Sequence, residues 1–290
     1  MKRKIFVVGS INTDLAIQTP YMPQKGETIT GSGFFVAQGG KGANQAVAAA
    51  RLGGEVIMCG CVGGDDFGTA ALNALQADGI NTTHIRRVDA PTGTAVIILS
   101  QGDNRIILDK GANACLTKED IDDVLREAQP GDLYLTQLEN PIEIIGYGLQ
   151  KAHEKGLYVV LNPAPATKEV EPYLQYCDLL TPNETETELL GGKEALLQKV
   201  KTLLITQGGE GYTIIDSRGE HTYPCKKIKP VDTTAAGDTL CGGLCAYMAE
   251  GHSLEGSAFF GSHAATLACT RMGAQPSIPT VEETFAFMNQ

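Results

Sequence analysis

The sequence lacks the features that mark membrane, secreted and nucleic-acid-binding proteins. No apolar run approaches the roughly 18 residues of a membrane span, and the run Ile5 to Val8 is too short for the core of a signal peptide. Positive charge is scarce, because 23 Lys and Arg face 34 Asp and Glu, for a formal net charge of −11. Such a chain repels nucleic acid and anionic lipid. We expect a cytoplasmic protein with small-molecule partners, no nucleic acid and no membrane.

Several cofactor and metal signatures are also absent. The eight cysteines include no C-x-x-C pair and no histidine at zinc-ligand spacing, so reduced thiols are expected. Neither Gly40-Lys41 nor Gly192-Lys193 is followed by Ser or Thr, which excludes a Walker A loop. No complete G-x-G-x-x-G follows a strand, which disfavours a dinucleotide-dependent dehydrogenase. Asp66-Phe67-Gly68 matches the protein-kinase triplet, but without a His-Arg-Asp we read it as chance.

What the chain does contain is an alternation of short apolar runs and helical segments. Ile5 to Val8, Val56 to Cys61 and Leu203 to Thr206 are typical of buried parallel strands. Residues 43–52 read as a helix, Thr117-x-x-Asp120 is expected to cap the start of a second, and Pro141 is expected to be the first residue of a third. The alternation predicts an α/β fold with helices on both faces of a mostly parallel sheet.

Two stretches depart from this alternation. Residues 12–38 are poor in helix formers, and Thr94 to Leu99 with Arg105 to Leu108 read as a hairpin turning at residues 101–104. Together they predict a small separate sheet with one apolar face, for which we expect Phe34, Val36, Ile97 and Leu99. An exposed sheet of this kind invites pairing, so we predict a homodimer through it.

The strongest local motif is Asp232-Thr233-Thr234-Ala235-Ala236-Gly237-Asp238, just before a helix. Small residues let a ligand approach the backbone, and the unpaired amides of a first helical turn bind anions. A carboxylate there would repel phosphate, so Asp238 reads as a general base for an attacking hydroxyl. The alternative is an aspartate that caps an ordinary helix.

Three weaker motifs precede it. Gly39 to Asn44 is a glycine-rich turn whose Lys41 and Asn44 can bond hydroxyls. Asn183 to Glu186 follows a strand and can hold Mg²⁺ through water, or it is simply an acidic helix start. Gly9 to Asp14 places an amide and a carboxylate on one side of an extended chain, where they can grip a diol, or it is a turn.

The four motifs, in this order across nearly the whole chain, resemble the ribokinase family of sugar kinases. Further matching stretches are Gly26-Glu27-Thr28, Gly64-Asp65-Asp66, Asn162 to Ala166 and Gly273 to Ser277. The resemblance implies a three-layer α/β/α domain, built from residues 1–11, 39–91 and 111–290, with a β lid of residues 12–38 and 92–110. It also implies transfer of the ATP γ-phosphate to the 5-hydroxyl of a pentose, with D-ribose giving ribose 5-phosphate.

The resemblance further implies a role for individual residues. Asp238 would be the base, with an anion hole formed by the amides of Ala235, Ala236 and Gly237. The sugar would contact Asn12, Asp14, Gly40, Lys41, Gly42, Asn44, Glu139 and Asp238. The nucleotide would lie along Asn183, Thr206, Gly208, Gly211, Gly237, Ser262 and His263. Asn183 and Glu186 would organise Mg²⁺ through water. A monovalent cation, K⁺, would lie at Asp232, Thr234, Ala268, Arg271, Gly273 and Ser277.

Two departures from the family pattern concern the nucleotide. The connection from Gly191 to Leu203 is about a helix shorter than expected, which would alter the surface beside the nucleotide. At position 262 the family pattern predicts Asn or His, whereas this chain has Ser262 followed by His263. Sibling kinases of deoxyribose, fructose or a nucleoside stay open as alternatives, as does a non-catalytic sugar-binding regulatory protein.

Overall fold

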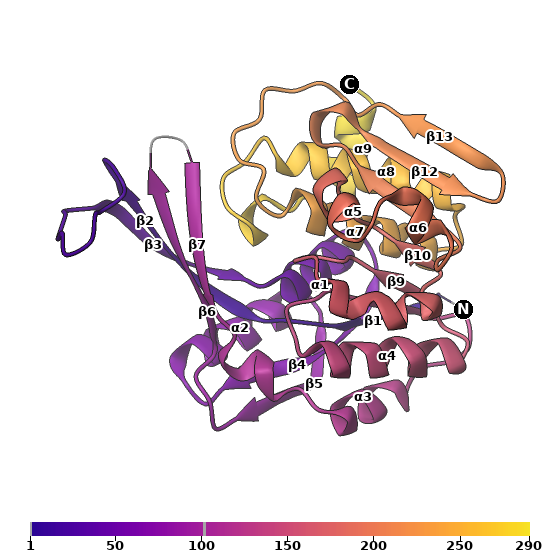
Figure 1. Cartoon of the computed structure of the whole chain (residues 1–290), viewed down its shortest axis with the longest axis horizontal. Helices are drawn as coiled ribbons and strands as arrows, with labels where there is room; N and C mark the ends of the chain where they lie inside the picture. The colour runs from indigo at the N-terminus through magenta and orange to yellow at the C-terminus, as the bar shows by residue number, and fades with distance from the viewer. Residues whose placement is uncertain (1, 101–102) are drawn as a thin grey trace.

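The parallel strands predicted from the apolar runs form one large sheet in the computed structural model, which describes residues 2–100 and 103–290 (Figure 1). Within these residues the sheet has nine strands in the order β13-β12-β11-β10-β9-β8-β1-β4-β5, all parallel from β11 to β5. The strands are β1 (Lys4–Val8), β4 (Glu55–Gly63), β5 (Asn81–Val88), β8 (Leu133–Thr136), β9 (Tyr158–Leu161), β10 (Leu179–Leu180), β11 (Leu203–Thr206), β12 (Tyr212–Asp216) and β13 (Gly219–Tyr223). The last two add an antiparallel hairpin.

Helices cover both faces of this sheet, which confirms the three-layer α/β/α prediction. One core unites α1 and α7 with β1 and β4, and the other unites α3 and α4 with β8 and β9. The α-helices are α1 (Lys41–Arg51), α2 (Asp66–Ala77), α3 (Lys118–Leu125), α4 (Ile142–Glu154), α5 (Glu184–Leu189), α6 (Lys193–Leu197), α7 (Ala236–Ala249), α8 (Leu254–Ala268) and α9 (Val281–Met288). The short 3₁₀ helices are η1 (Gly111–Cys115), η2 (Lys168–Tyr176), η3 (Gly208–Glu210) and η4 (Gln275–Ser277).

Two helix starts differ from the sequence prediction. Helix α1 begins at Lys41 and not at Ala43, because Gly40 takes the positive φ of 90° at its N-cap. Pro141 is the N-cap of α4, with an extended ψ of 127°, so Ile142 is the first helical residue. The predicted cap at Thr117 is confirmed, since Thr117 and Asp120 form a reciprocal capping box at the start of α3.

The predicted small sheet is present, and it projects from the body like an arm (Figure 1). Its four strands run in the order β3-β2-β6-β7, with β2 and β6 parallel and the outer pairs antiparallel. They are β2 (Asn12–Thr19), β3 (Ser32–Gly39), β6 (Gly93–Ser100) and β7 (Asp103–Asp109). Of the predicted turn at residues 101–104, residues 101 and 102 lie outside the described residues.

The prediction that Phe34, Val36, Ile97 and Leu99 share one apolar face of the small sheet is wrong. Val36 and Val96 both pair with Leu15, whereas Ile97 and Phe35 both pair with Ala16. Because cross-strand partners share a face, Val36 lies on one face, together with Phe34 by alternation, while Ile97 and Leu99 lie on the other. Both faces of the sheet are therefore apolar. The inner face, with Phe35, Ile97 and Leu99, lines a cavity against the body.

Candidate active site

The carboxyl ends of the parallel strands gather the predicted motifs at one edge of the large sheet. Gly9 to Asn12 follow β1, Glu139 follows β8, Asn162 follows β9 and Asn183 follows β10. Helices α1 and α7 begin at the same edge, so their first-turn amides face the loops. Ligands of open α/β sheets bind at this edge, and the sequence motifs thus converge on one place.

Asp238 lies in the first turn of α7 and is only 7% exposed. Its Oδ2 accepts a hydrogen bond from Asn44 Nδ2 at 3.0 Å, and its Oδ1 accepts one from Gln45 Nε2 at 2.9 Å. The remaining lone pairs face a cavity of about 220 Å³ that Asp238 lines together with Lys41 and Glu186. A carboxylate held on two sides and open on a third has the placement of a general base.

The start of α7 has a backbone suited to a close ligand. Ala235 adopts the left-handed conformation, with φ 60° and ψ 12°, which is rare outside glycine. A Cβ placed on Gly237 would meet no atom within 4 Å, so this residue borders open space. Ala235, Ala236 and Gly237 all line the small cavity. The amide of Ala236 already donates to the Thr233 carbonyl at 3.2 Å, which leaves Ala235 and Gly237 as the better candidates for an anion hole.

The glycine-rich turn before α1 depends on close backbone contact. A Cβ on Gly40 would lie 2.7 Å from the Asn12 nitrogen, and one on Gly42 would lie 2.5 Å from the Ser10 nitrogen. The turn can therefore pack directly on the end of β1, where Ser10 donates to Glu139. The Lys41 amide donates to the same carboxylate at 3.2 Å.

Lys41 is placed among carboxylates. Burial alone would lower the pKa of its ammonium group, but the charges of Asp238, Glu139 and Glu186 outweigh burial and raise it. The side chain is therefore a cation at neutral pH. It lines the small cavity beside Asp238, where an arriving anionic phosphate would meet a positive charge.

Asn12 and Asp14 lie at the start of β2, within the small sheet itself. Burial, and then the negative charges of Glu139 and Asp238, raise the pKa of Asp14 to about 6. Asn12 is buried, and its Oδ1 accepts from Asn113 Nδ2 at 2.7 Å. Asn113 also brackets the backbone of Ile11 through two further hydrogen bonds. Sequence reasoning missed Asn113, which holds Asn12 in place from η1.

Asn183 and Glu186 form a capping box at the start of α5. Asn183 Oδ1 accepts from the Glu186 amide and Glu186 Oε2 accepts from the Asn183 amide, each at 2.8 Å. The motif is thus an acidic helix start, which was the alternative left open from the sequence. Both residues nevertheless also line the small cavity. Burial raises the pKa of Glu186.

A second cavity of about 540 Å³ adjoins the first and is large enough for a drug-sized ligand. It is lined by Thr206, Gly208, Gly211 and Ser262, as the sequence predicted. Sequence reasoning missed its other wall, which comes from Cys225, Lys226, Lys227, Leu240 and Cys269. No short motif marks these residues, because they come from separate segments that meet only in the fold.

His263 lies apart from this cavity. Its Nδ1 pairs with the Phe259 carbonyl at 2.8 Å, and its ring packs against the rings of Phe259 and Phe287. Ser262, which is one residue earlier on α8, faces the cavity instead. Successive helical residues point about 100° apart, which explains why only one of the two reaches it.

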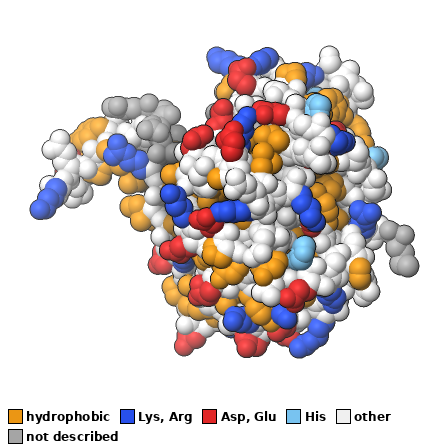
Figure 2. All heavy atoms as spheres, turned by 45° about the vertical axis from the view of Figure 1, so that its right-hand side comes forward, with side chains coloured by type: hydrophobic (Ala, Val, Ile, Leu, Met, Phe, Trp, Pro, Cys, Tyr) orange, Lys and Arg blue, Asp and Glu red, His pale blue; other side chains and the backbone are white. Residues whose placement is uncertain are grey.

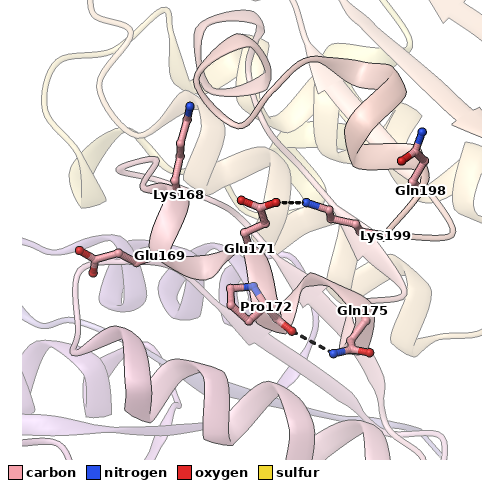
Figure 3. Close-up of a pocket in the computed structure, with 7 residues that line it drawn as sticks. All are labelled: Lys168, Glu169, Glu171, Pro172, Gln175, Gln198 and Lys199. Atoms are coloured by element: carbon pink, nitrogen blue, oxygen red, sulfur yellow. Dashed lines mark hydrogen bonds and ion pairs between the residues drawn. The ribbon is translucent and has the colours of Figure 1, made fainter.

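The short connection before β11 borders a different hollow, shown in Figure 3. Gln198 and Lys199 line it on one side and η2 lines it on the other. Lys199 forms an ion pair with Glu171 across it, and Gln175 donates to the Pro172 carbonyl. In the described part of the chain this hollow shares no lining residue with the two cavities at Asp238.

The loop before α7 is closed by Asp232. Its Oδ1 accepts from the Thr234 amide at 2.9 Å and from the Thr234 hydroxyl at 2.6 Å, and its Oδ2 accepts from the Gly273 amide at 2.9 Å. Burial would raise the pKa of Asp232, but these hydrogen bonds outweigh it and lower the pKa. The carboxylate thus ties the loop to the segment after α8.

The other predicted residues of this segment have different partners. Arg271 forms a bidentate ion pair with Glu283, so its side chain points away from Asp232. The Ser277 hydroxyl is buried and donates to the Ala274 carbonyl at 2.8 Å. The carbonyl of Ala268 accepts from the Arg271 amide at 3.0 Å. Among residues 2–100 and 103–290, no group of three or more His, Cys, Asp or Glu is arranged to hold a metal ion.

A third cavity, of about 630 Å³, separates the small sheet from the loop of residues 230–234. Asp14, Phe35 and Ile97 line it from the sheet. Thr233 lines all three cavities, and Ala236 and Gly237 line both cavities beside α7. The hollows are therefore contiguous, with Asp238 beside their junction.

Comparison with known proteins gives this arrangement a family. The pfkB family of carbohydrate kinases matches residues 2–281. The ribokinase of Haemophilus influenzae is 39% identical, with 99% of each chain covered. The solved ribokinase of Thermotoga maritima superposes with a TM-score of 0.89 at 36% identity, covering 99% of this chain and 100% of its own. The Arabidopsis thaliana ribokinase complexed with ribose and ATP superposes with a TM-score of 0.87 at 30% identity, covering all of both chains.

Fold and site together define an ATP-dependent carbohydrate kinase. The chain belongs to the pfkB family, and within it to the ribokinase-type sugar kinases.

Among residues 2–100 and 103–290, each helix is too short or too polar to cross a bilayer.

Proposed function

We propose that the protein transfers the γ-phosphoryl group of ATP to the 5-hydroxyl of D-ribose, forming ribose 5-phosphate. The observation that carries this proposal is the position of Asp238. Its carboxylate lies beside the junction of one cavity under the small sheet and another between β11 and α8. A sugar in the first and a nucleotide in the second would meet at this carboxylate.

Ribose would lie against the residues at the end of β1 and the start of α1. Asn12, Asp14, Lys41, Asn44 and Glu139 present amide, carboxylate and ammonium groups there. Asn44 Oδ1 is buried with no partner among the described residues, which fits an acceptor waiting for a sugar hydroxyl. Gly40 and Gly42 would offer backbone groups to the sugar while they pack on the end of β1.

Asp238 would take the proton of the 5-hydroxyl as that oxygen attacks the γ-phosphorus. The bond from phosphorus to the β-γ bridging oxygen breaks, and ADP leaves. The amides at the start of α7 and the Lys41 ammonium would stabilise the charge of the transferring group, which is the larger part of phosphoryl-transfer catalysis. ATP would lie along Thr206, Gly208, Gly211 and Ser262, whereas His263 would support Ser262 from behind.

The donor set of the small cavity fits Mg²⁺. This ion is usually held by one or two carboxylates, waters and substrate phosphates and not by an all-protein cage. Glu186 and Asn183 line the cavity and are fixed by their capping box. We infer that they bind Mg²⁺ through water, and that the ion neutralises phosphate charge.

We also infer a monovalent cation site beside Asp232. One carboxylate among neutral oxygens from Thr234, Ala268, Gly273 and Ser277 suits K⁺ better than a divalent ion. Asp232 and Gly273 are already linked by a hydrogen bond, which supports the placement. Arg271 would contribute only its carbonyl, because its guanidinium pairs with Glu283. The ion would order the loop that carries the anion hole.

Residues 12–38 and 92–110 would act as a lid over the sugar, on a body of residues 1–11, 39–91 and 111–290. The outer face of the small sheet exposes Phe34 by 63% and Ile107 by 65%. Hydrophobic atoms are visible on the projecting arm in Figure 2. We infer that two such faces pack together in a homodimer. The eight cysteines, all in the described part of the chain, are free, which fits a cytoplasmic setting.

An ADP-release assay over a panel of sugars tests the proposal. D-ribose should give a higher kcat/KM than 2-deoxyribose, fructose or a nucleoside, because a site built to bond a hydroxyl penalises its absence. A preference for 2-deoxyribose would indicate a sibling activity. Sugar binding without ADP release from any substrate would indicate a regulatory protein.

A further inference from the structure

The hydrogen bonds behind Asp238 come from a buried chain of neutral amides. Gln45 on α1 is 0% exposed. Its Nε2 donates to Asp238 Oδ1 at 2.9 Å and to Asn162 Oδ1 at 3.1 Å, while its Oε1 accepts from Gln137 Nε2 at 2.6 Å. Every polar atom of the Gln45 side chain is therefore engaged.

Acceptor chemistry determines which way the Gln45 amide points. Asn162 Nδ2 donates to the Thr181 carbonyl at 2.9 Å, and since a carbonyl only accepts, the Asn162 oxygen must face Gln45. An ionised Asp238 also only accepts. A flipped Gln45 would therefore place its oxygen against two other oxygens. The amide group is set with both N–H bonds toward acceptors, one of them the carboxylate.

The chain of amides ties Asp238 to the rigid edge of the large sheet. Gln137 follows β8, Asn162 follows β9 and Thr181 follows β10. Gln137 and Asn162 are themselves buried. Gly9 leaves the space for Gln137, because a Cβ there would collide with Gln137 Oε1. Three strand ends thus converge on one side chain, which in turn holds the carboxylate.

We propose that Gln45 is the positioning residue of this enzyme, fixing the plane of the Asp238 carboxylate and stabilising its ionised form through the Thr181–Asn162–Gln45 and Gln137–Gln45 hydrogen bonds. This inference rests on the proposed role of Asp238 as base. Hydrogen bonds to a carboxylate favour its charged form and are stronger than neutral ones. Gln45 lies behind Asp238 and acts only through it.

Other ionisable groups also face Asp238 and belong to the same electrostatic setting. Lys41 on α1 is the cation; Asp14 on β2 and Glu186 on α5 are acids, and Cys241 on α7 is a thiol. All four are retained in a variant at position 45. A difference between variant and wild type in the pH dependence of kcat, measured at saturating ribose, therefore reports the loss of the Gln45 donor.

The test is Gln45→Met, which keeps the volume and removes the donor. We expect kcat to fall by roughly ten- to a hundredfold, with the KM for ribose within about twofold. The acidic limb of the kcat profile should move to higher pH by about one unit, because the ionised base has lost a donor. Gln45→Glu should move it further, because two carboxylates then share one site.

A matched control is Val47→Ala, a buried position on the same helix that faces the apolar core. It should lower Tm and leave both kcat and the acidic limb in place. If Gln45→Met and Gln45→Glu lower kcat with an unmoved limb, Gln45 is merely structural and the inference fails. Unchanged kcat in either folded variant also overturns it. If Asp238→Asn retains activity, the base assignment itself fails, which is a different outcome.

Discussion

The two sheets of the protein differ in how they are covered. Strand β1 of the large sheet is almost entirely buried between helices, and the loops at its carboxyl end are fixed by hydrogen bonds such as Ser10 to Glu139. The small sheet has an inner apolar face over a cavity and an outer apolar face exposed at Phe34 and Ile107. Under the proposed function, the buried body would hold the base on α7, whereas the small sheet would close over the sugar and meet a partner.

This difference predicts that chemistry depends on the body and that substrate capture and association depend on the small sheet. Substitutions in the body should therefore lower kcat, whereas substitutions in the small sheet should change KM or the oligomeric state.

The first prediction concerns the base on the body. Asp238→Asn keeps the shape but removes the proton acceptor, so kcat should fall by roughly 10²–10⁴. The Kd for ribose, measured by calorimetry without ATP, should change by less than about tenfold. A variant with near-wild-type kcat would show that another group takes the proton.

The second prediction concerns Asp14, which the small sheet contributes. Asp14→Asn should lower kcat/KM for ribose by roughly 10- to 100-fold, mainly through KM, because a charged hydrogen-bond partner of the sugar is lost. Steady-state kinetics over a ribose series separates the two parameters.

The same variant should have the opposite effect on stability. The pKa of Asp14 is about 6 in the folded protein, above its ordinary 3.8, so its ionised form costs folding energy. The stabilisation of the folded state by the protonated Asp14 carboxyl is complete below about pH 4 and is lost as the pH rises through 6. Asp14→Asn should therefore raise Tm by a few degrees at pH 8 and by almost nothing at pH 4. A Tm that falls at pH 8 would contradict the buried-charge explanation.

The third prediction concerns the proposed cation site at Asp232, in the loop before α7. With ATP and Mg²⁺ at matched ionic strength, K⁺ should raise kcat by about tenfold over a bulky organic cation, through ordering of the anion hole. Asp232→Ala should flatten that difference. Identical rates of the wild type in potassium, caesium, sodium and organic-cation salts would exclude the site.

The fourth prediction concerns the outer face of the small sheet. Ile107→Asp should shift a dimer toward monomer at micromolar concentration in light scattering, because a charge enters an apolar interface. Leu189→Asp is the control, since Leu189 is equally apolar and 55% exposed but lies on α5 of the body. A wild type that is monomeric at this concentration would refute association through the small sheet.

Much of this architecture is readable from local patterns. Short apolar runs predicted the parallel strands, and Thr117 with Asp120 predicted a cap, because strand and cap signals depend on neighbours in the chain. The motif before Asp238 and the turn at Gly40 can also be recognised from neighbouring residues alone. At position 40 glycine is needed for a φ of 90° and for contact with the end of β1.

Local patterns along the chain were thus sufficient to predict the three-layer fold, the family and the sugar-kinase motifs. The side chains that support these motifs became apparent only in the folded arrangement. Gln45 and Asn113 have no local signal, because their partners are 193 and 101 positions away along the chain. The face of the small sheet on which Phe34 lies depends on strand register, since a shift of one residue moves every side chain to the opposite face. The choice of Ser262 over His263 depended on how α8 is rotated against the cavity, and long-range packing sets that rotation.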